Sequence, residues 1–111
     1  MNANKKGKRF ELQVAKYLSK EFGSEIRRTP NSGGLSLKGD IMATQGILSE
    51  FNWECKNQEK LNVWNAYTQC DMNAKHYEPL VIIKKNNYKS LAVVDLDYFI
   101  NMHKEKEDGE T

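Results

Sequence analysis

The segment Glu54-Cys55-Lys56 places an acid and a lysine two residues apart. Because alternate residues of a β-strand point to the same face, a strand here would present the carboxylate and the ammonium group side by side. Such a pair could bind a metal ion through the acid and hold an attacking water or a phosphate through the lysine. By itself, however, the segment favours the ordinary explanation, which is a solvated strand face.

A second carboxylate, Asp40, is predicted to lie opposite Glu54. Residues 40–44 and 49–56 have the pattern of two strands. A hairpin centred near Ile47 would pair residue 40 with residue 54, about 5 Å apart. Like charges at that spacing are destabilising unless a cation lies between them. Mg²⁺ often takes one or two carboxylates together with substrate phosphate, so this pair predicts a magnesium site, at which Mn²⁺ should substitute.

Glu11 is a third acid in an unexpected position. Residues 4–22 are predicted to form a helix whose apolar residues recur at helical spacing, and these are Val14, Ala15, Leu18 and Phe22. Glu11 lies on this stripe, where a carboxylate is costly without a partner. Two explanations stay open: Glu11 is at the fringe of the stripe in an ion pair with a lysine or arginine, or it faces Asp40 and Glu54 as a further ligand of metal or water.

The loop from Arg27 to Gly34 has the composition of an anion-binding segment, with two arginines, polar side chains and two glycines. Glycines let backbone amides approach an anion, and arginines grip phosphate in a forked geometry. A plain surface turn would explain the loop equally well. Charge points the same way, since residues 1–38 carry nine Lys and Arg against three acids, and residues 39–111 carry eight against twelve. The basic N-terminal third suggests a polyanionic partner, although it could simply solvate a helix face.

The remaining elements complete a mixed α/β domain with one β-sheet flanked by helices. Asn62 is a predicted N-cap for a helix to about Tyr77, residues 80–83 and 91–94 form a hairpin, and Asp95 caps a last helix through Met102. Residues 25–28 are predicted to form a short strand, so the element order is α-β-β-β-α-β-β-α. We expect a single domain over 1–102 and a charged, frayed tail over 103–111.

Several classes of protein are disfavoured by composition. No apolar run approaches the roughly 20 residues of a membrane span, and the N-terminus has no apolar signal region, so we expect a cytoplasmic protein. Cys55 and Cys70 form no CxxC pair and are expected to be reduced core thiols. His76 and His103 are far from both cysteines in the sequence and are expected at the surface, which gives a zinc site little support.

The motifs together resemble the PD-(D/E)xK nuclease superfamily. A helical Glu, an Arg-rich Ser-Gly-Gly loop, Gly-Asp-Ile and then Glu-Cys-Lys occur in the expected order on the expected elements. Spacing and loop are most similar to archaeal-type Holliday junction resolvases and their small phage-encoded relatives. The resemblance covers roughly residues 5–85, and it implies a restriction-endonuclease-like core. If the chain is phage-encoded, its location would be the host cytoplasm.

The resemblance also implies roles for single residues. Asp40 and Glu54 would bind the divalent metal with the main-chain carbonyl of Cys55, and Glu11 would complete the site. Lys56 would position or activate water. Ser32 would lie near the scissile phosphate as a further catalytic residue. One departure is Gly39, which stands where the superfamily name has proline.

The DNA-binding residues implied by this resemblance and by the charge pattern come from the N-terminal third. They are Lys5, Lys6, Lys8, Arg9, Arg27, Arg28, Asn31, Ser32, Gly33 and Gly34.

The predicted function is hydrolysis of DNA phosphodiester bonds by a metal-activated water. The resemblance implies 5′-phosphate and 3′-hydroxyl products. It also implies a homodimer that places two sites on opposite strands of a four-way junction. Two alternatives stay open. One is a nuclease of the same superfamily that acts on duplex or flap DNA in repair or restriction. The other is a DNA-binding module that does not cut.

Overall fold

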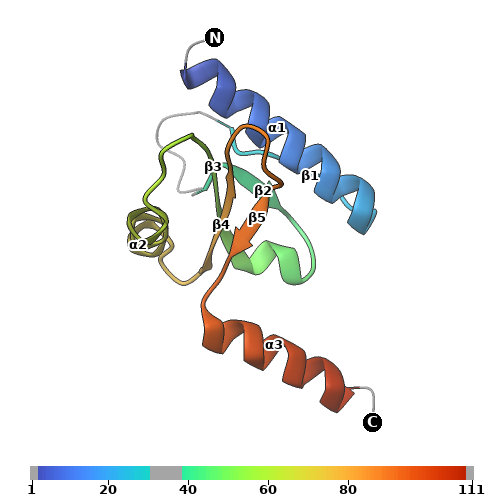
Figure 1. The fold of residues 1–111 in the computed structure, drawn as a ribbon. Coiled ribbons are helices and arrows are strands. Elements are labelled where there is room, and N and C mark those ends of the chain that lie inside the picture. Colours follow the sequence, from blue (N-terminus) through green and yellow to red (C-terminus); the bar gives the residue numbers. More distant parts are fainter. Residues whose placement is uncertain (1–2, 31–38, 110–111) are drawn as a thin grey trace.

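The computed structural model describes residues 3–30 and 39–109 (Figure 1). Five strands form one mixed sheet, and the chain order of helices and strands is the predicted one. The elements are α1 (Ala3–Phe22), β1 (Ile26–Arg28), β2 (Ile41–Ala43), the 3₁₀ helix η1 (Ile47–Glu50), β3 (Phe51–Asn57), α2 (Val63–Asn73), β4 (Glu78–Lys84), β5 (Leu91–Val93) and α3 (Leu96–Gly109). The predicted fold class, a single mixed sheet flanked by helices, is confirmed.

The sheet has the order β1-β2-β3-β4-β5. Its neighbouring strands are antiparallel except for β3 and β4, which are parallel. A parallel pair needs a crossover connection, and α2 provides it. Helix α1 packs against β1, β2 and β3, whereas α2 packs against β3 and β4. Helix α3 extends away from the sheet, as Figure 1 shows, and gives the molecule its long dimension of 51 Å.

The alternation of side chains along β3 divides the core in two. Trp53 and Cys55 join a cluster with residues of α1, which includes Phe10 and Ala15. The other face of β3 points toward α2, where the buried side chain of Asn52 donates from Nδ2 to the carbonyl oxygen of Cys70 at 3.0 Å. Glu54 and Lys56 share this second face, because they lie two and four residues beyond Asn52.

The predicted helix caps are confirmed. Oδ1 of Asn62 accepts a hydrogen bond from the backbone N–H of Asn65, and Oδ2 of Asp95 accepts one from the N–H of Tyr98. Gly23 follows α1 with a φ of 64°, and its N–H donates to the carbonyl of Ser19. The two cysteines are free and buried, and His76 and His103 are exposed, as expected.

Several boundaries differ from the predicted ones, including the start of β4, which is Glu78 instead of Leu80. Strand β3 begins at Phe51 because η1 occupies the preceding residues, and Nε1 of Trp53 holds this turn by donating to the carbonyl of Leu48. Helix α2 ends at Asn73 instead of near Tyr77, and Lys75 then adopts a φ of 55°. Helix α3 continues beyond Met102 to Gly109, so most of the tail predicted to be frayed is helical. The proposed division into a domain and a tail stays a prediction.

Among the described residues, no helix has both the length and the apolar character needed to cross a membrane.

Candidate active site

The register of β2 and β3 brings Asp40 next to Glu54. Ile41 pairs with Trp53, which is the register predicted from a hairpin centred near Ile47. Asp40 and Glu54 are the next residues outward along the two strands, and their carboxyl groups are in hydrogen-bonding contact. Two acids from separate strands therefore meet at one point on the sheet.

The position of Asp40 is fixed by its backbone and by its side chain. Its N–H donates to the carbonyl of Trp53 at 2.6 Å, and its own carbonyl accepts from the N–H of Thr29 at 3.0 Å. Oδ2 of Asp40 also accepts from the backbone N–H of Cys55 at 2.7 Å. A carboxylate held by this many contacts is orientated before any ligand arrives.

Gly39 is a structural requirement of this arrangement. Its φ is 81°, which proline cannot adopt, so the departure from the superfamily name has a physical reason. A Cβ atom on Gly39 would lie 2.6 Å from the carbonyl oxygen of Trp53. The close approach of Gly39 to β3 therefore allows Asp40 to reach Glu54. The sequence alone did not reveal this role, although a glycine immediately before a predicted site acid was the available signal.

The environment of Glu54 disfavours the charged form of its carboxyl group. Burial, the nearby charge of Asp40 and the hydrogen bond with Asp40 together raise the pKa of Glu54 from 4.5 to about 7. The charge of Lys56 opposes this rise, and the charge of Glu11 adds to it. All four residues predicted to form the centre are therefore close enough to act on one titrating group.

The ion pair that the sequence left open for Glu11 is confirmed, and the role of Glu11 as a ligand of metal or water stays a prediction. Its carboxylate accepts a hydrogen bond from Nε of Arg28 at 3.0 Å, and its side chain is 17% exposed. The negative charge of Asp40 also acts on the Glu11 carboxylate. Burial raises the pKa of Glu11 more than the hydrogen bond from Arg28 lowers it, and Asp40 adds to the rise. Glu11 is thus both an ion-pair partner and a neighbour of the Asp40–Glu54 pair.

Comparison with known proteins agrees with this geometry. Residues 2–108 match the model of the family described as "Phage putative PDDEXK endonuclease". The chain belongs to this family. No curated protein matches it in sequence at a significant level. A solved structure with a similar fold is that of Hjc, a Holliday junction resolvase from the archaeal hyperthermophile Archaeoglobus fulgidus, with a TM-score of 0.56. The two chains are 22% identical over 79% of this chain and 76% of that chain, a level that shows the fold alone.

Membership of the PDDEXK endonuclease family makes the chain a nuclease and supports a divalent metal at its centre. The donor set fits such an ion. Asp40 and Glu54 offer the hard oxygen ligands that Mg²⁺ prefers, and without a cation between them the charge of Asp40 helps to raise the pKa of Glu54. Within residues 3–30 and 39–109, no three His, Cys, Asp or Glu side chains are grouped closely enough to hold a metal. The fit therefore rests on two carboxylates, with the remaining ligands from the backbone, water or substrate.

The predicted DNA-binding residues of this endonuclease differ in their exposure and in the contacts that they make. Arg28 is engaged by Glu11, Lys6 lies 3.9 Å from Glu59, and the exposed Arg27 lies 3.8 Å from Glu25. Lys8 and Arg9 are exposed on α1. Lys5 is also exposed on α1 and interacts with a neighbouring group. The remaining four, Asn31, Ser32, Gly33 and Gly34, lie outside the described residues, so the roles proposed for them are unchanged.

Proposed function

We propose that this nuclease hydrolyses DNA phosphodiester bonds in a Mg²⁺-dependent reaction at the Asp40–Glu54 pair, and that its substrate is a four-way DNA junction. The observation that carries the proposal is the contact of these two carboxyl groups across β2 and β3. A structural ion pair would join opposite charges, whereas this site joins two acids at half-buried positions. Such an arrangement destabilises the metal-free protein and suits a cation-binding site.

The ligands and neighbouring groups have separate proposed roles. Asp40, Glu54 and the main-chain carbonyl of Cys55 would hold the ion, and Glu11 would complete the site from α1. When bound, the ion supplies positive charge to the phosphate and makes a nearby water more acidic. Lys56 lies on the same strand face as Glu54, where its ammonium group orients water or contacts a phosphate oxygen. Ser32 would contact the scissile phosphate, and the proposed products carry 5′-phosphate and 3′-hydroxyl ends.

The choice of a four-way junction is supported by the fold and by symmetry. Hjc, whose fold is similar, is a Holliday junction resolvase. A junction has two equivalent strands to cut, which a homodimer with two sites would match. We therefore propose a homodimer with one site in each protomer. Its basic surface would include Arg27, Lys8 and Arg9, which are exposed and could contact phosphates without first breaking a buried contact.

A cleavage panel tests this proposal. Labelled four-way junction, flap and linear duplex of matched sequence are incubated with the protein and Mg²⁺, and the products are resolved on denaturing gels. We expect paired, symmetric cuts in the junction and little cleavage of the linear duplex. Equal cleavage of duplex or flap would instead assign the protein to repair or restriction chemistry. DNA binding without any cut would favour a non-cutting module.

A further inference from the structure

A cleft outside the acidic site opens at the end of the sheet. Its volume is about 370 Å³, within the range of clefts that bind small organic groups. It lies between the loop after β3 and the hairpin formed by β4 and β5. Its walls are mainly apolar and include Leu61, Val63, Ile83 and Leu91. Nothing in the reaction proposed above uses this cleft.

The strand register places the cleft next to the proposed active site. Ile83 is paired with Lys56 across β3 and β4, and Leu91 is paired with Ile83 across β4 and β5. Paired residues on neighbouring strands point to the same face of a sheet, and the strands are about 4.8 Å apart. The apolar floor of the cleft therefore begins one strand away from Lys56. It lies on the face that also carries Glu54.

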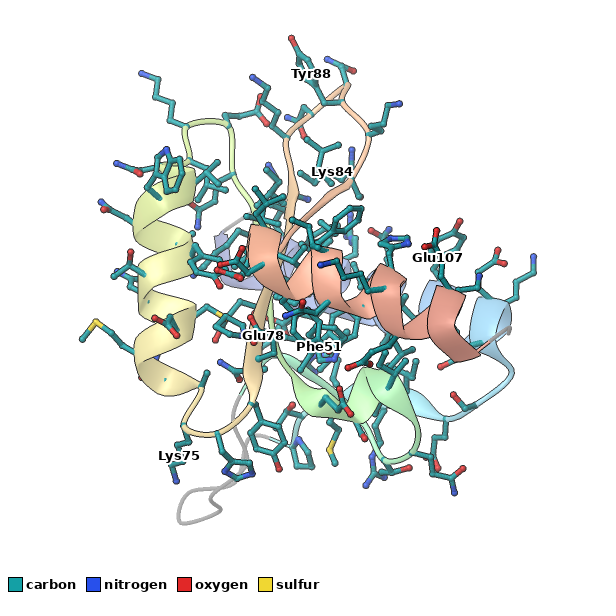
Figure 2. All side chains as sticks on the ribbon, turned by 90° about the horizontal axis from the view of Figure 1, so that it is seen from below. Phe51, Lys75, Glu78, Lys84, Tyr88 and Glu107 are labelled. Carbon is teal, nitrogen blue, oxygen red and sulfur yellow. The ribbon has the colours of Figure 1, made fainter. Side chains whose placement is uncertain are left out.

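The rim of the cleft is basic and aromatic. Tyr88 is at the far end of the β4–β5 hairpin (Figure 2), and it is 61% exposed. Nζ of Lys85 lies 4.3 Å from the centroid of the Tyr88 ring. Lys85 thus lies over one face of a largely exposed ring that lines the cleft. Lys84 and Lys89 also line the cleft, so its lining carries three positive charges against one negative charge, that of Glu59.

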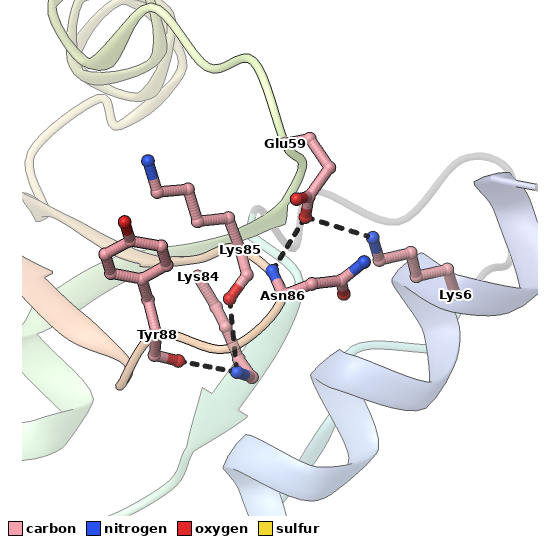
Figure 3. A network of polar contacts seen from close by, with 6 residues as sticks. All are labelled: Lys6, Glu59, Lys84, Lys85, Asn86 and Tyr88. Atoms are coloured by element: carbon pink, nitrogen blue, oxygen red, sulfur yellow. Dashed lines mark hydrogen bonds and ion pairs between the residues drawn. The ribbon is translucent and has the colours of Figure 1, made fainter.

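The hairpin is held in place before any ligand binds. A carboxylate oxygen of Glu59 accepts from the backbone N–H of Asn86 at 2.7 Å and lies 3.9 Å from Nζ of Lys6 (Figure 3). Nζ of Lys84 donates to the carbonyl of Tyr88 at 2.6 Å. These contacts tie the loop after β3, the hairpin turn and α1 together. The cleft is therefore preformed, which reduces the ordering cost of binding.

We propose that this cleft binds an unpaired nucleotide of the DNA substrate, close to the phosphate that is cut. The base would pack against the apolar floor and the exposed ring of Tyr88, and the neighbouring phosphates would contact Lys85 and Lys89. A base in intact duplex has both faces covered by its neighbours, so it cannot enter. The apolar walls offer few hydrogen-bonding groups, and recognition would therefore tolerate any base sequence. This inference rests on the proposed nuclease function and adds that a base at the branch point of the junction is unpaired when it is bound.

Binding measurements with matched variants test the inference. Fluorescence anisotropy is measured in Ca²⁺ for two labelled DNAs of equal length, one fully paired and one with unpaired nucleotides at a fork. Stacking of a base on an aromatic ring is worth about 1 to 3 kcal/mol by alanine substitution. Tyr88→Ala should therefore bind the forked DNA roughly 5- to 150-fold more weakly and the duplex within about twofold of wild type. Tyr17→Ala is the control, because Tyr17 is 64% exposed on α1 and lies outside the cleft.

A second variant and a crosslink keep the inference testable if Tyr88→Ala is unstable in thermal melts. Leu91→Trp should fill the cleft from β5 and produce the same selective loss. A photoreactive 5-iodouracil at the unpaired position should crosslink to Tyr88 in the wild type. Fork binding that is unchanged in both variants would overturn the inference and leave the cleft to another occupant, such as a protein segment. Equal losses on fork and duplex would also overturn it, whereas a wild type that neither binds nor cuts DNA would refute the proposed function itself.

Discussion

The side chains of Asp40 and Glu54 hydrogen-bond across two strands, and burial and the charge of Asp40 raise the pKa of Glu54 and favour its protonated form in the metal-free protein. The contact makes stability depend on pH. The folded protein holds the Glu54 proton up to a pKa of about 7, whereas the unfolded chain releases it near 4.5. Between these values the native state binds more protons than the unfolded state, so stability falls as pH rises through this window.

We therefore expect metal-free wild type to melt at a lower temperature at pH 7.5 than at pH 5. The full shift would correspond to about 3 kcal/mol, and solvent screening of this partly exposed group reduces the expected loss to about 1 to 2 kcal/mol. Thermal melts in EDTA at several pH values measure it. Glu54→Gln is the control and should show a clearly smaller fall. Parallel curves for the two proteins would mean that Glu54 is not the titrating group.

Glu11→Gln should raise the melting temperature of the metal-free protein slightly and reduce cleavage strongly. Burial and Asp40 both oppose the charge of Glu11, and a glutamine can still accept the hydrogen bond from Arg28. Thermal melts in EDTA, together with single-turnover cleavage in Mg²⁺, measure the two effects. A variant that is fully active and less stable would remove Glu11 from the catalytic centre and leave it as an ion-pair partner.

Arg28 and its neighbour Arg27 allow a matched test of the ion pair between Arg28 and Glu11. Arg28→Ala leaves the half-buried Glu11 carboxylate without its donor and should cost about 1 to 3 kcal/mol of unfolding free energy. Arg27→Ala removes an exposed contact and should cost less than about 0.5 kcal/mol. Chemical denaturation measures both. Arg27→Ala should instead flatten the salt dependence of DNA binding by about one unit of slope, as expected for a lost phosphate contact. Equal stability losses would contradict the difference in burial.

Gly39→Ala should destabilise the protein by more than about 2 kcal/mol, because it combines a left-handed backbone with overlap against the carbonyl of Trp53. Gly46→Ala is the control. Gly46 has a similar φ of 73°, but a Cβ there would meet nothing within 4 Å, so the strain alone should cost about 1 kcal/mol. Denaturation midpoints compare the two variants. Similar losses at both positions would show that the contact between Gly39 and β3 is unimportant.

The parts of this architecture that depend on local pattern were predictable from the sequence. The alternation in β3 and a hairpin centred near Ile47 predicted the Asp40–Glu54 pairing. Polar residues before helices predicted the caps at Asn62 and Asp95. Glu11 was recognisable because an acid on an apolar stripe breaks the pattern. These features depend on residues that are close together in the chain or on a strict period.

Features that depend on distant contacts were not predictable. Residues 49 and 50 were predicted to begin a strand, but they belong to η1, where Trp53 donates to Leu48. The partner of Glu11 could not be chosen among several basic residues, and Arg28 is selected only when β1 packs on α1. The extension of α3 to Gly109 was missed because its charged residues carry no apolar period. The cleft beside Tyr88 forms from three separate segments, which no local pattern reports.

The central claim is that Asp40 and Glu54 hold the metal of a nuclease, and single-turnover cleavage across a Mg²⁺ titration tests it most directly. The wild type, Asp40→Asn and Glu54→Gln are compared on a labelled four-way junction, with binding of the same DNA measured in parallel. Both substitutions keep side-chain volume and remove a ligand charge, so both variants should bind the junction at least as well as wild type. Neither should cleave it at any Mg²⁺ concentration. A variant that binds the junction and cuts it within about tenfold of the wild-type rate, about 1.4 kcal/mol in barrier, would contradict this assignment of the metal site.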